Sequence, residues 1–122
     1  MRYLCAVYLE LKNMEMLSLA EGTTLDRDSI AYDEELRGGG HYIASDALQL
    51  ANTARTLRVR NGKLSVTDGP FAETKEHLGG FILIEATDLA EAIALAAKIP
   101  MATIGTIEVR PVREDMSRGT RG

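Results

Sequence analysis

Residues 54–68 read ARTLRVRNGKLSVTD, and the chain continues through residues 69–76 as GPFAETKE. Asn61-Gly62 separates two stretches in which apolar and polar residues alternate, and this dipeptide favours a two-residue type I′ turn. The turn sets the register of a β-hairpin, and extending the ladder to its base places Arg55 opposite Asp68. The sequence therefore predicts a hairpin that ends where a dense group of charged and turn-forming residues begins.

The two faces of this hairpin differ in chemistry, because side chains alternate along a strand. The face that carries Arg55 and Asp68 is otherwise apolar, and we expect it to be buried; its members are Leu57, Val59, Leu64 and Val66. The opposite face is basic, with Arg58, Arg60 and Lys63. We expect this second face to be in contact with solvent.

The segments on either side of the hairpin predict two βαβ units. Strands are expected at residues 3–9 and 80–86, both apolar on two faces, with a short strand at residues 41–44 and a final strand at residues 104–112. Pro111 indicates that the last strand lies at an edge of the sheet. Helices are expected at residues 23–37, after a weak short helix within 13–22, and at residues 88–99, where Pro100 ends the helix.

This order predicts an α+β fold: a ferredoxin-like split βαβ arrangement with an antiparallel sheet and both helices on one face. The central strands are apolar on both faces, but two helices cover only one face. A second copy of the chain, packed sheet against sheet, is the simplest cover for the other. We therefore expect a homodimer.

The composition limits the classes of function that the chain can have. The chain has 122 residues, 45% of them hydrophobic and 26% charged, which suits one globular domain at residues 1–115 with a flexible polar tail at 116–122. A net charge of −4 gives no basic surface for nucleic acid. One cysteine, Cys5, excludes a disulfide within the chain, and no apolar run is long enough to cross a membrane. We expect a cytoplasmic protein.

Asp68 is the first candidate for a functional side chain, and two interpretations stay open. It is either a turn cap that accepts hydrogen bonds from backbone N–H groups two residues on, or a carboxylate that serves a ligand as charge anchor or general base. An arginine partner, Arg55, stabilises the charged carboxylate, and this favours an anchor over a proton acceptor.

Three further candidates for proton transfer follow within ten positions: Glu73, Lys75 and His77. Their alternative interpretation is a solvated loop with ordinary surface charges. An imidazole ionises near neutral pH, so His77 is the natural proton-transfer candidate, and His41, after the glycine run 38–40, is a second histidine of the same kind. No short spacing of His, Cys and carboxylates predicts a metal site, and we expect no metal and no cofactor.

Several segments together resemble one family. Residues 67–76 (TDGPFAETKE) and 78–81 (LGGF) resemble the signature of the YCII-related, DGPF-domain proteins of bacteria. The resemblance extends over nearly the whole chain, through residues 2–4 (RYL), 34–36 (EEL), 56–62 (TLRVRNG), 88–92 (DLAEA) and 107–111 (IEVRP). It implies a ferredoxin-like dimeric α+β barrel.

For function, the resemblance implies two classes. Wider relatives include small enzymes that act on cyclic or aromatic organic molecules, and a His–Asp pair has been proposed as the active site in the YCII branch. This chain has no histidine between its first strand and its first helix, where that histidine is expected. Related DGPF domains also resemble partners encoded beside extracytoplasmic-function sigma factors, which implies a regulatory role.

The leading hypothesis is a dimeric small-molecule-binding protein; catalysis without a prosthetic group is one interpretation of it, and the question of whether it is an enzyme stays open. Asp68 with Arg55 would anchor a polar group, and Glu73, Lys75 or His77 would transfer the proton. The expected remainder of the ligand site is Phe71, Phe81, Tyr32 and His41. The alternative is a non-catalytic module that senses a ligand or binds a regulatory protein partner in transcription.

Overall fold

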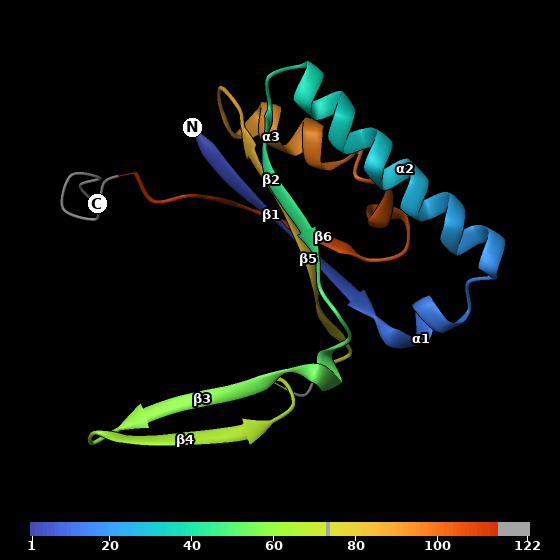
Figure 1. The fold of residues 1–122 in the computed structure, drawn as a ribbon. Coiled ribbons are helices and arrows are strands. Elements are labelled where there is room, and N and C mark those ends of the chain that lie inside the picture. The colour runs from blue at the N-terminus through green and yellow to red at the C-terminus, as the bar shows by residue number, and fades with distance from the viewer. Residues whose placement is uncertain (73, 115–122) are drawn as a thin grey trace.

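The computed structural model describes residues 1–72 and 74–114, and their secondary structure is α+β (Figure 1). The strands are β1 (Arg2–Glu10), β2 (Tyr42–Ala47), β3 (Arg55–Arg60), β4 (Lys63–Asp68), β5 (Glu76–Glu85) and β6 (Thr106–Pro111). The α-helices are α1 (Leu11–Glu15), α2 (Leu19–Gly38) and α3 (Leu89–Ala96), with 3-10 turns at Ala51–Thr53 and Pro100–Thr103. The expected tail, residues 116–122, lies outside the described residues.

Four strands form an antiparallel sheet in the order β2-β5-β1-β6. Because β5 lies between β1 and β2, the unit β1-α2-β2 is a split βαβ, and the unit β5-α3-β6 is split by β1 in the same way. This is the predicted topology. Strand β6 is an edge strand, which confirms the expectation drawn from Pro111.

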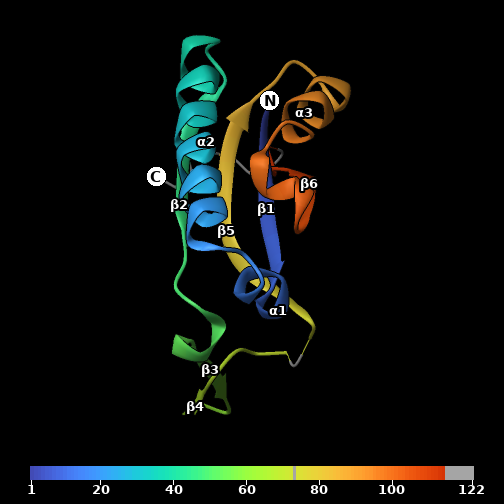
Figure 2. The ribbon, with the colours of Figure 1, turned by 90° about the vertical axis from the view of Figure 1, so that its right-hand side faces the viewer.

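Helices α2 and α3 cover one face of the sheet (Figure 2). The core lies between these layers, with Tyr3, Cys5 and Ile84 of the sheet buried to 2% exposure or less. The helices contribute Tyr32 and Leu36 from α2 and Ala92 and Ala96 from α3. The other face of the sheet carries no helix in the described chain (Figure 1). None of the described helices combines the length and the apolar character that a membrane span requires.

The start of α2 corrects a prediction. The helix begins at Leu19, four residues before Thr23, because Ser18 and Glu21 form a capping box: the Ser18 hydroxyl accepts from the Glu21 N–H, and the Glu21 carboxylate accepts from the Ser18 N–H. Gly22 therefore lies inside the first turn and does not end a helix. The weak helix expected within residues 13–22 is the short α1 at Leu11–Glu15.

The second correction concerns the segment before the apolar part of β5. The sequence places His77 in a loop and begins the strand at Gly80, but β5 already begins at Glu76. His77 pairs with Leu9 of β1, and the register shifts between Val7 and Tyr8, where Gly79 is the extra residue. Thr106 donates a hydrogen bond to the Glu76 carboxylate, which ties this extension to β6. After α3, Pro100 opens a 3-10 turn.

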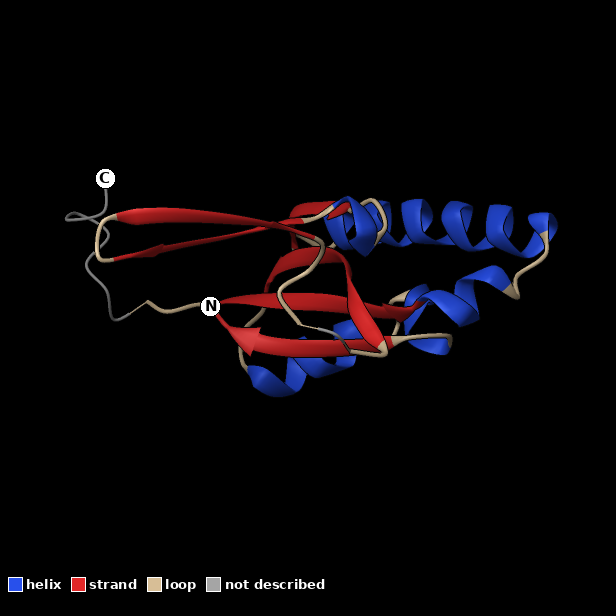
Figure 3. Cartoon of the chain, turned by 90° about the horizontal axis from the view of Figure 1, so that it is seen from below, coloured by secondary structure: helices blue, strands red, loops and turns tan. Residues whose placement is uncertain are grey.

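The hairpin confirms the predicted register and contradicts the predicted burial. Asn61 has a φ of 53° and Gly62 of 74°, as a type I′ turn requires, and Arg55 lies opposite Asp68. However, β3 and β4 pair only with each other and extend away from the main sheet as a separate arm (Figures 1 and 3). The apolar hairpin face is 57–63% exposed at Leu57, Val59, Leu64 and Val66. The alternation identifies the apolar face correctly, but nothing in the described chain packs on that face.

Candidate functional site

The base of the hairpin borders a cavity of about 600 Å³, which we call the signature cavity. Asp68, Gly69 and Pro70 contribute one wall, and Thr74, Lys75 and His77 contribute another. Apolar side chains from the end of β1, from α1, from the segment after β2 and from β5 complete it: Leu9, Leu11, Met14, Leu48, Leu50 and Leu78. The site is therefore assembled from four separate parts of the chain.

Backbone hydrogen bonds hold these parts in place. The Gly69 N–H donates to the Ala54 carbonyl over 2.8 Å, and Gly69 has a φ of 92°, which favours glycine at this turn. The Thr56 hydroxyl donates to the Gly69 carbonyl over 2.9 Å. The Leu48 N–H donates to the Gly79 carbonyl, which keeps the segment after β2 beside β5.

Asp68 makes an ion pair with Arg55, with 3.1 Å between Nε and Oδ1. The Asp68 side chain is 91% exposed, so water strongly screens this pair, and it adds little to stability. Within the described residues, no backbone N–H donates to the Asp68 carboxylate. The turn-cap interpretation is therefore supported by no hydrogen bond in the described residues, and the carboxylate is accessible to a ligand.

Lys75 and His77 approach the same cavity from β5 and the residues just before it. Lys75 is exposed and His77 is half-buried against Leu9, its partner across the strands. Asp68, Lys75 and His77 thus line one cavity that also has apolar walls. Such a set can anchor a polar group of a ligand and move a proton to or from it.

None of the five predicted ligand-binding residues lines the signature cavity. Arg55 points its guanidinium to Asp68 and to the Thr53 and Ala54 carbonyls. Phe71 is 74% exposed and lies under the Arg58 guanidinium at 5.1 Å, on the basic side of the hairpin. Phe81 is half-buried in β5 and borders a different cavity.

Tyr32 belongs to the core. Its side chain is 7% exposed, its hydroxyl donates to the Leu95 carbonyl over 2.5 Å, and burial, followed by the charge of Glu35, raises the pKa of Tyr32 to about 12. This hydroxyl links α2 to α3.

His41 follows α2, and its Nδ1 lies 2.8 Å from the Glu85 carbonyl, so that nitrogen carries the proton. It lies at the other end of β5 from His77. Glu73, the remaining candidate, lies outside the described residues.

Sequence patterns did not indicate the apolar wall of the signature cavity. Leu11 and Met14 are three residues apart on α1, and Leu11 is 49% exposed. Their spacing on one face of a short polar helix is the signal that could have found them. Among the described residues, no group of three or more His, Cys, Asp or Glu side chains is placed to hold a metal ion.

Comparison with known proteins agrees with this architecture. The family model of the YCII-related domain matches residues 1–115, which contain both βαβ units and the signature cavity. The chain belongs to the YCII-related domain family. A relative in Rhizobium meliloti (strain 1021), called uncharacterized protein R00369, is 49% identical over 61 residues. That match covers 48% of this chain and 49% of the relative, so it spans about half the length of the curated protein.

Proposed function

We propose that this YCII-related protein is a homodimer that binds a small cyclic or aromatic organic molecule in the signature cavity and acts on it without a prosthetic group. One observation carries the proposal: Asp68, Lys75 and His77, which the sequence singles out, line a single cavity with apolar walls. Its volume of about 600 Å³ lies within the usual range for small-molecule sites.

The chemistry of the lining defines the ligand class. The apolar walls suit a ring or a short hydrocarbon body, while Lys75 and Asp68 suit a polar group that both accepts and donates hydrogen bonds. His77 is the group that exchanges a proton with the bound molecule. In this scheme Asp68 is an anchor, because its carboxylate is exposed and accepts hydrogen bonds from a polar group of the ligand.

Two surfaces support the homodimer. The helix-free face of the sheet exposes Leu4 and Ile43 to 36% and 41%, and the hairpin arm projects on this same side of the sheet (Figure 1). A chain of this mass has an accessible surface of about 6,500 Å² when compact, whereas this chain has 8558 Å². A second copy that lies against the sheet and under the arm would cover part of this excess.

Charge favours a second copy as the occupant. Residues 55–68 carry four basic residues and one acidic residue, a net charge of +3, while the whole chain carries −4. The remainder of the chain therefore has a net charge of −7, and the arm of one protomer is electrostatically complementary to the body of another.

The test is a ligand-observed NMR screen of small cyclic and aromatic acids, alcohols and amides against the wild-type chain, three cavity variants and one control variant. We expect compounds that bind the wild type to lose at least about tenfold in affinity in Asp68→Asn and Lys75→Met. His41→Gln is the matched control for His77→Gln, since both remove an imidazole but only His77 lines the cavity. Circular dichroism of every variant checks that the fold is kept.

Two results would contradict the proposal. One is a set of binders that the Asp68, Lys75 and His77 variants retain at full affinity. The other is unfolding of Asp68→Asn, because that result would make Asp68 a structural turn residue.

The exposed apolar hairpin face also suits the alternative, a ligand-sensing module that binds a regulatory protein in transcription. The two functions differ in what the arm contacts. If the arm serves a different protein, charged substitutions at Val59 and Leu64 will leave the oligomeric state of the purified chain unchanged. If it contacts a second copy, they will dissociate the dimer.

A further inference from the structure

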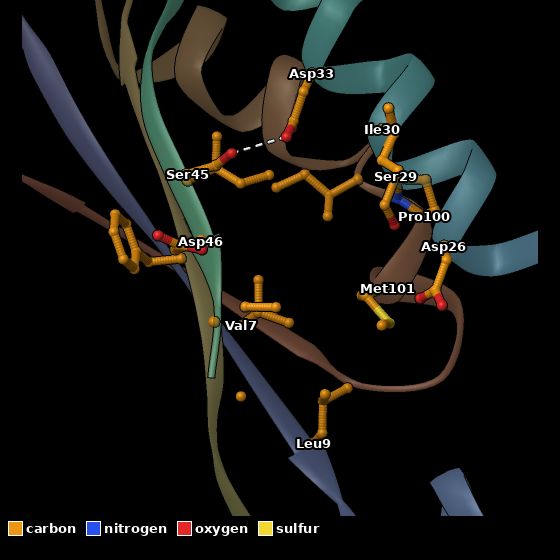
Figure 4. A pocket seen from close by; sticks show the side chains of 16 residues that line it. Val7, Leu9, Asp26, Ser29, Ile30, Asp33, Ser45, Asp46, Pro100 and Met101 are labelled. Carbon is orange, nitrogen blue, oxygen red and sulfur yellow. Dashed lines mark hydrogen bonds between the residues drawn. The ribbon is translucent and has the colours of Figure 1, made fainter. Parts of the chain in front are cut away.

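A second cavity lies between α2 and the helix-covered face of the sheet, and we call it the helix-side cavity (Figure 4). Its volume is about 430 Å³. Apolar walls come from the sheet and from the segment after α3, with Val7, Ile82, Ile99 and Met101 among them. It meets the signature cavity at Leu9 and Gly79, which line both, but none of the three ionisable residues of the signature cavity reaches it.

A chain of hydrogen bonds orients one carboxylate at this cavity. The Ser45 hydroxyl of β2 donates to Asp33 Oδ2 of α2 over 2.7 Å, and Figure 4 shows these two side chains pointing toward each other. The Tyr42 hydroxyl lies 2.9 Å from Ser45 Oγ and donates to it, since the Ser45 proton is committed to Asp33. The Arg37 guanidinium stacks over the Tyr42 ring at 4.2 Å and holds this first residue of the hydrogen-bond chain in place.

The face of α2 at this cavity is polar where a helix packed on a sheet is usually apolar. Asp26, Ser29 and Asp33 occupy positions i, i+3 and i+7, which share one side of a helix. Ser29 Oγ is buried and has no hydrogen-bond partner in the described structure. Buried hydroxyl groups are normally paired, so an unpaired one beside a cavity points to a partner that completes it.

The charge of the lining selects the kind of partner. Asp26 and Asp33 line the cavity, and Figure 4 shows the Asp46 carboxylate turned away from it. No Lys, Arg or His is among the described residues that line it, and none of the described ion pairs involves Asp26 or Asp33. An apolar cavity with carboxylates and no cation favours a positively charged ligand.

We propose that the helix-side cavity is a second binding site, and that it takes a protonated amine with a small apolar body. The ammonium group donates to the Asp33 carboxylate, which Ser45 holds in place, and the apolar body packs against Ile30, Ile99 and Met101. Asp26, two turns away on the same helix face, adds attraction without direct contact to the same ammonium group.

The probe is benzylammonium, with benzyl alcohol and benzoate as neutral and anionic compounds of similar shape. Titrations into the wild-type chain, followed by amide NMR at physiological ionic strength, limit the effect of general surface charge. We expect saturable shifts at residues 26–33 and 45–47 with benzylammonium. Benzyl alcohol binds at least about tenfold more weakly, as loss of a charge-assisted hydrogen bond predicts, and benzoate does not bind.

Variants distinguish binding in the helix-side cavity from attraction by the overall charge of the protein. Asp33→Asn weakens benzylammonium binding at least about tenfold, and Asp26→Asn weakens it less. The matched control is Asp28→Asn, which removes the same charge from the same helix at an exposed position outside the cavity and leaves binding unchanged. Asp68→Asn also leaves it unchanged, so this proposal can fail or hold independently of the signature cavity.

Three outcomes overturn the proposal. The first is equal affinity for benzylammonium and benzyl alcohol, and the second is an equal loss in Asp28→Asn and Asp33→Asn. The third is the absence of saturable shifts in the folded wild-type chain. If Asp33→Asn fails to fold, Ser45→Ala and the three-compound series on the wild type still test the proposal. Ser45→Ala removes the hydrogen bond to Asp33 and keeps the charge of Asp33.

Discussion

The carbonyl oxygen of Tyr8 lies 2.3 Å from the place where a Cβ at residue 105 would be, so glycine alone fits between β1 and the turn before β6. Gly22 is the opposite case: it is a helical glycine with no atom within 4 Å of a would-be Cβ. Glycine is therefore required at residue 105 by a close backbone approach, whereas at residue 22 it only lowers the helix propensity.

We expect Gly105→Ala to lower the free energy of unfolding by about 1–3 kcal/mol, because backbone atoms must move to admit the methyl group. Gly22→Ala should raise it by about 0.5–1 kcal/mol, since alanine costs less backbone entropy in a helix. Urea denaturation measures both. A loss of stability in Gly22→Ala would mean that the start of α2 is packed more tightly than its surroundings indicate.

Cys5 of β1 is fully buried in the core between the sheet and the helices, and burial raises the pKa of its thiol to about 11. Because only the thiolate reacts with alkylating reagents, we expect the folded chain to be nearly inert to iodoacetamide at pH 8. Labelling in denaturant should be fast, since the unfolded thiol has an ordinary pKa. Mass spectrometry of both reactions checks this. Rapid labelling of the native chain would show that β1 opens readily.

At the scale of elements, helix caps and turns account for most boundaries. Ser18 with Glu21 begins α2, Asp88 begins α3, and Asn61-Gly62 closes the hairpin. The capping box also explains why the helix does not begin at Thr23: Ser18 caps it five residues earlier, and the two reciprocal hydrogen bonds satisfy N–H groups that a single threonine would leave free.

The cap supports a test with pH. Ser18→Ala should lower the free energy of unfolding by about 1 kcal/mol. The Glu21 carboxylate accepts hydrogen bonds from the Ser18 backbone and side chain, and these lower the pKa of Glu21. A lowered pKa stabilises the fold above the ordinary value of 4.5, and this stabilisation disappears as the pH falls through the lowered value.

The difference in stability between the wild type and Glu21→Gln should therefore be present at neutral pH and disappear in acid. Urea denaturation at several pH values measures it. Asp28→Asn, an exposed carboxylate further along α2, is the control, since it takes no part in the cap. A pH-independent difference would show that Glu21 does not act through its charge.

At the scale of the whole molecule, the unusual feature is the arm formed by β3 and β4. Two strands without a third are marginal in water, and an apolar face this exposed is rare in a monomer. The arm lies on the helix-free side of the sheet, so one second copy can cover both surfaces (Figure 1).

We expect size-exclusion chromatography with light scattering to give a dimer for the wild type at micromolar concentrations. The double variant Val59→Lys, Leu64→Lys places two charges on the apolar hairpin face and should dissociate the dimer, because each buried charge without a partner costs several kcal/mol. Ser65→Lys adds a charge on the opposite face of β4 and should leave the dimer intact. A monomeric wild type, or dissociation by Ser65→Lys, contradicts the proposed interface.

The sequence by itself determined the local features: the hairpin register from Arg55–Asp68 to the Asn61-Gly62 turn, the order of the two βαβ units, the edge position of β6, and the family. Each depends on interactions between residues that are near in the chain, or on a pattern that repeats along it.

Only the tertiary structure decided which residues share a site and which faces are covered. Lys75, His77 and Asp68 line one cavity, and Asp33 meets Ser45, because the fold brings together segments that no local pattern connects. The same reason explains the wrong prediction for the hairpin. Alternation shows which face is apolar, but burial depends on what packs against that face, and in the described chain nothing does.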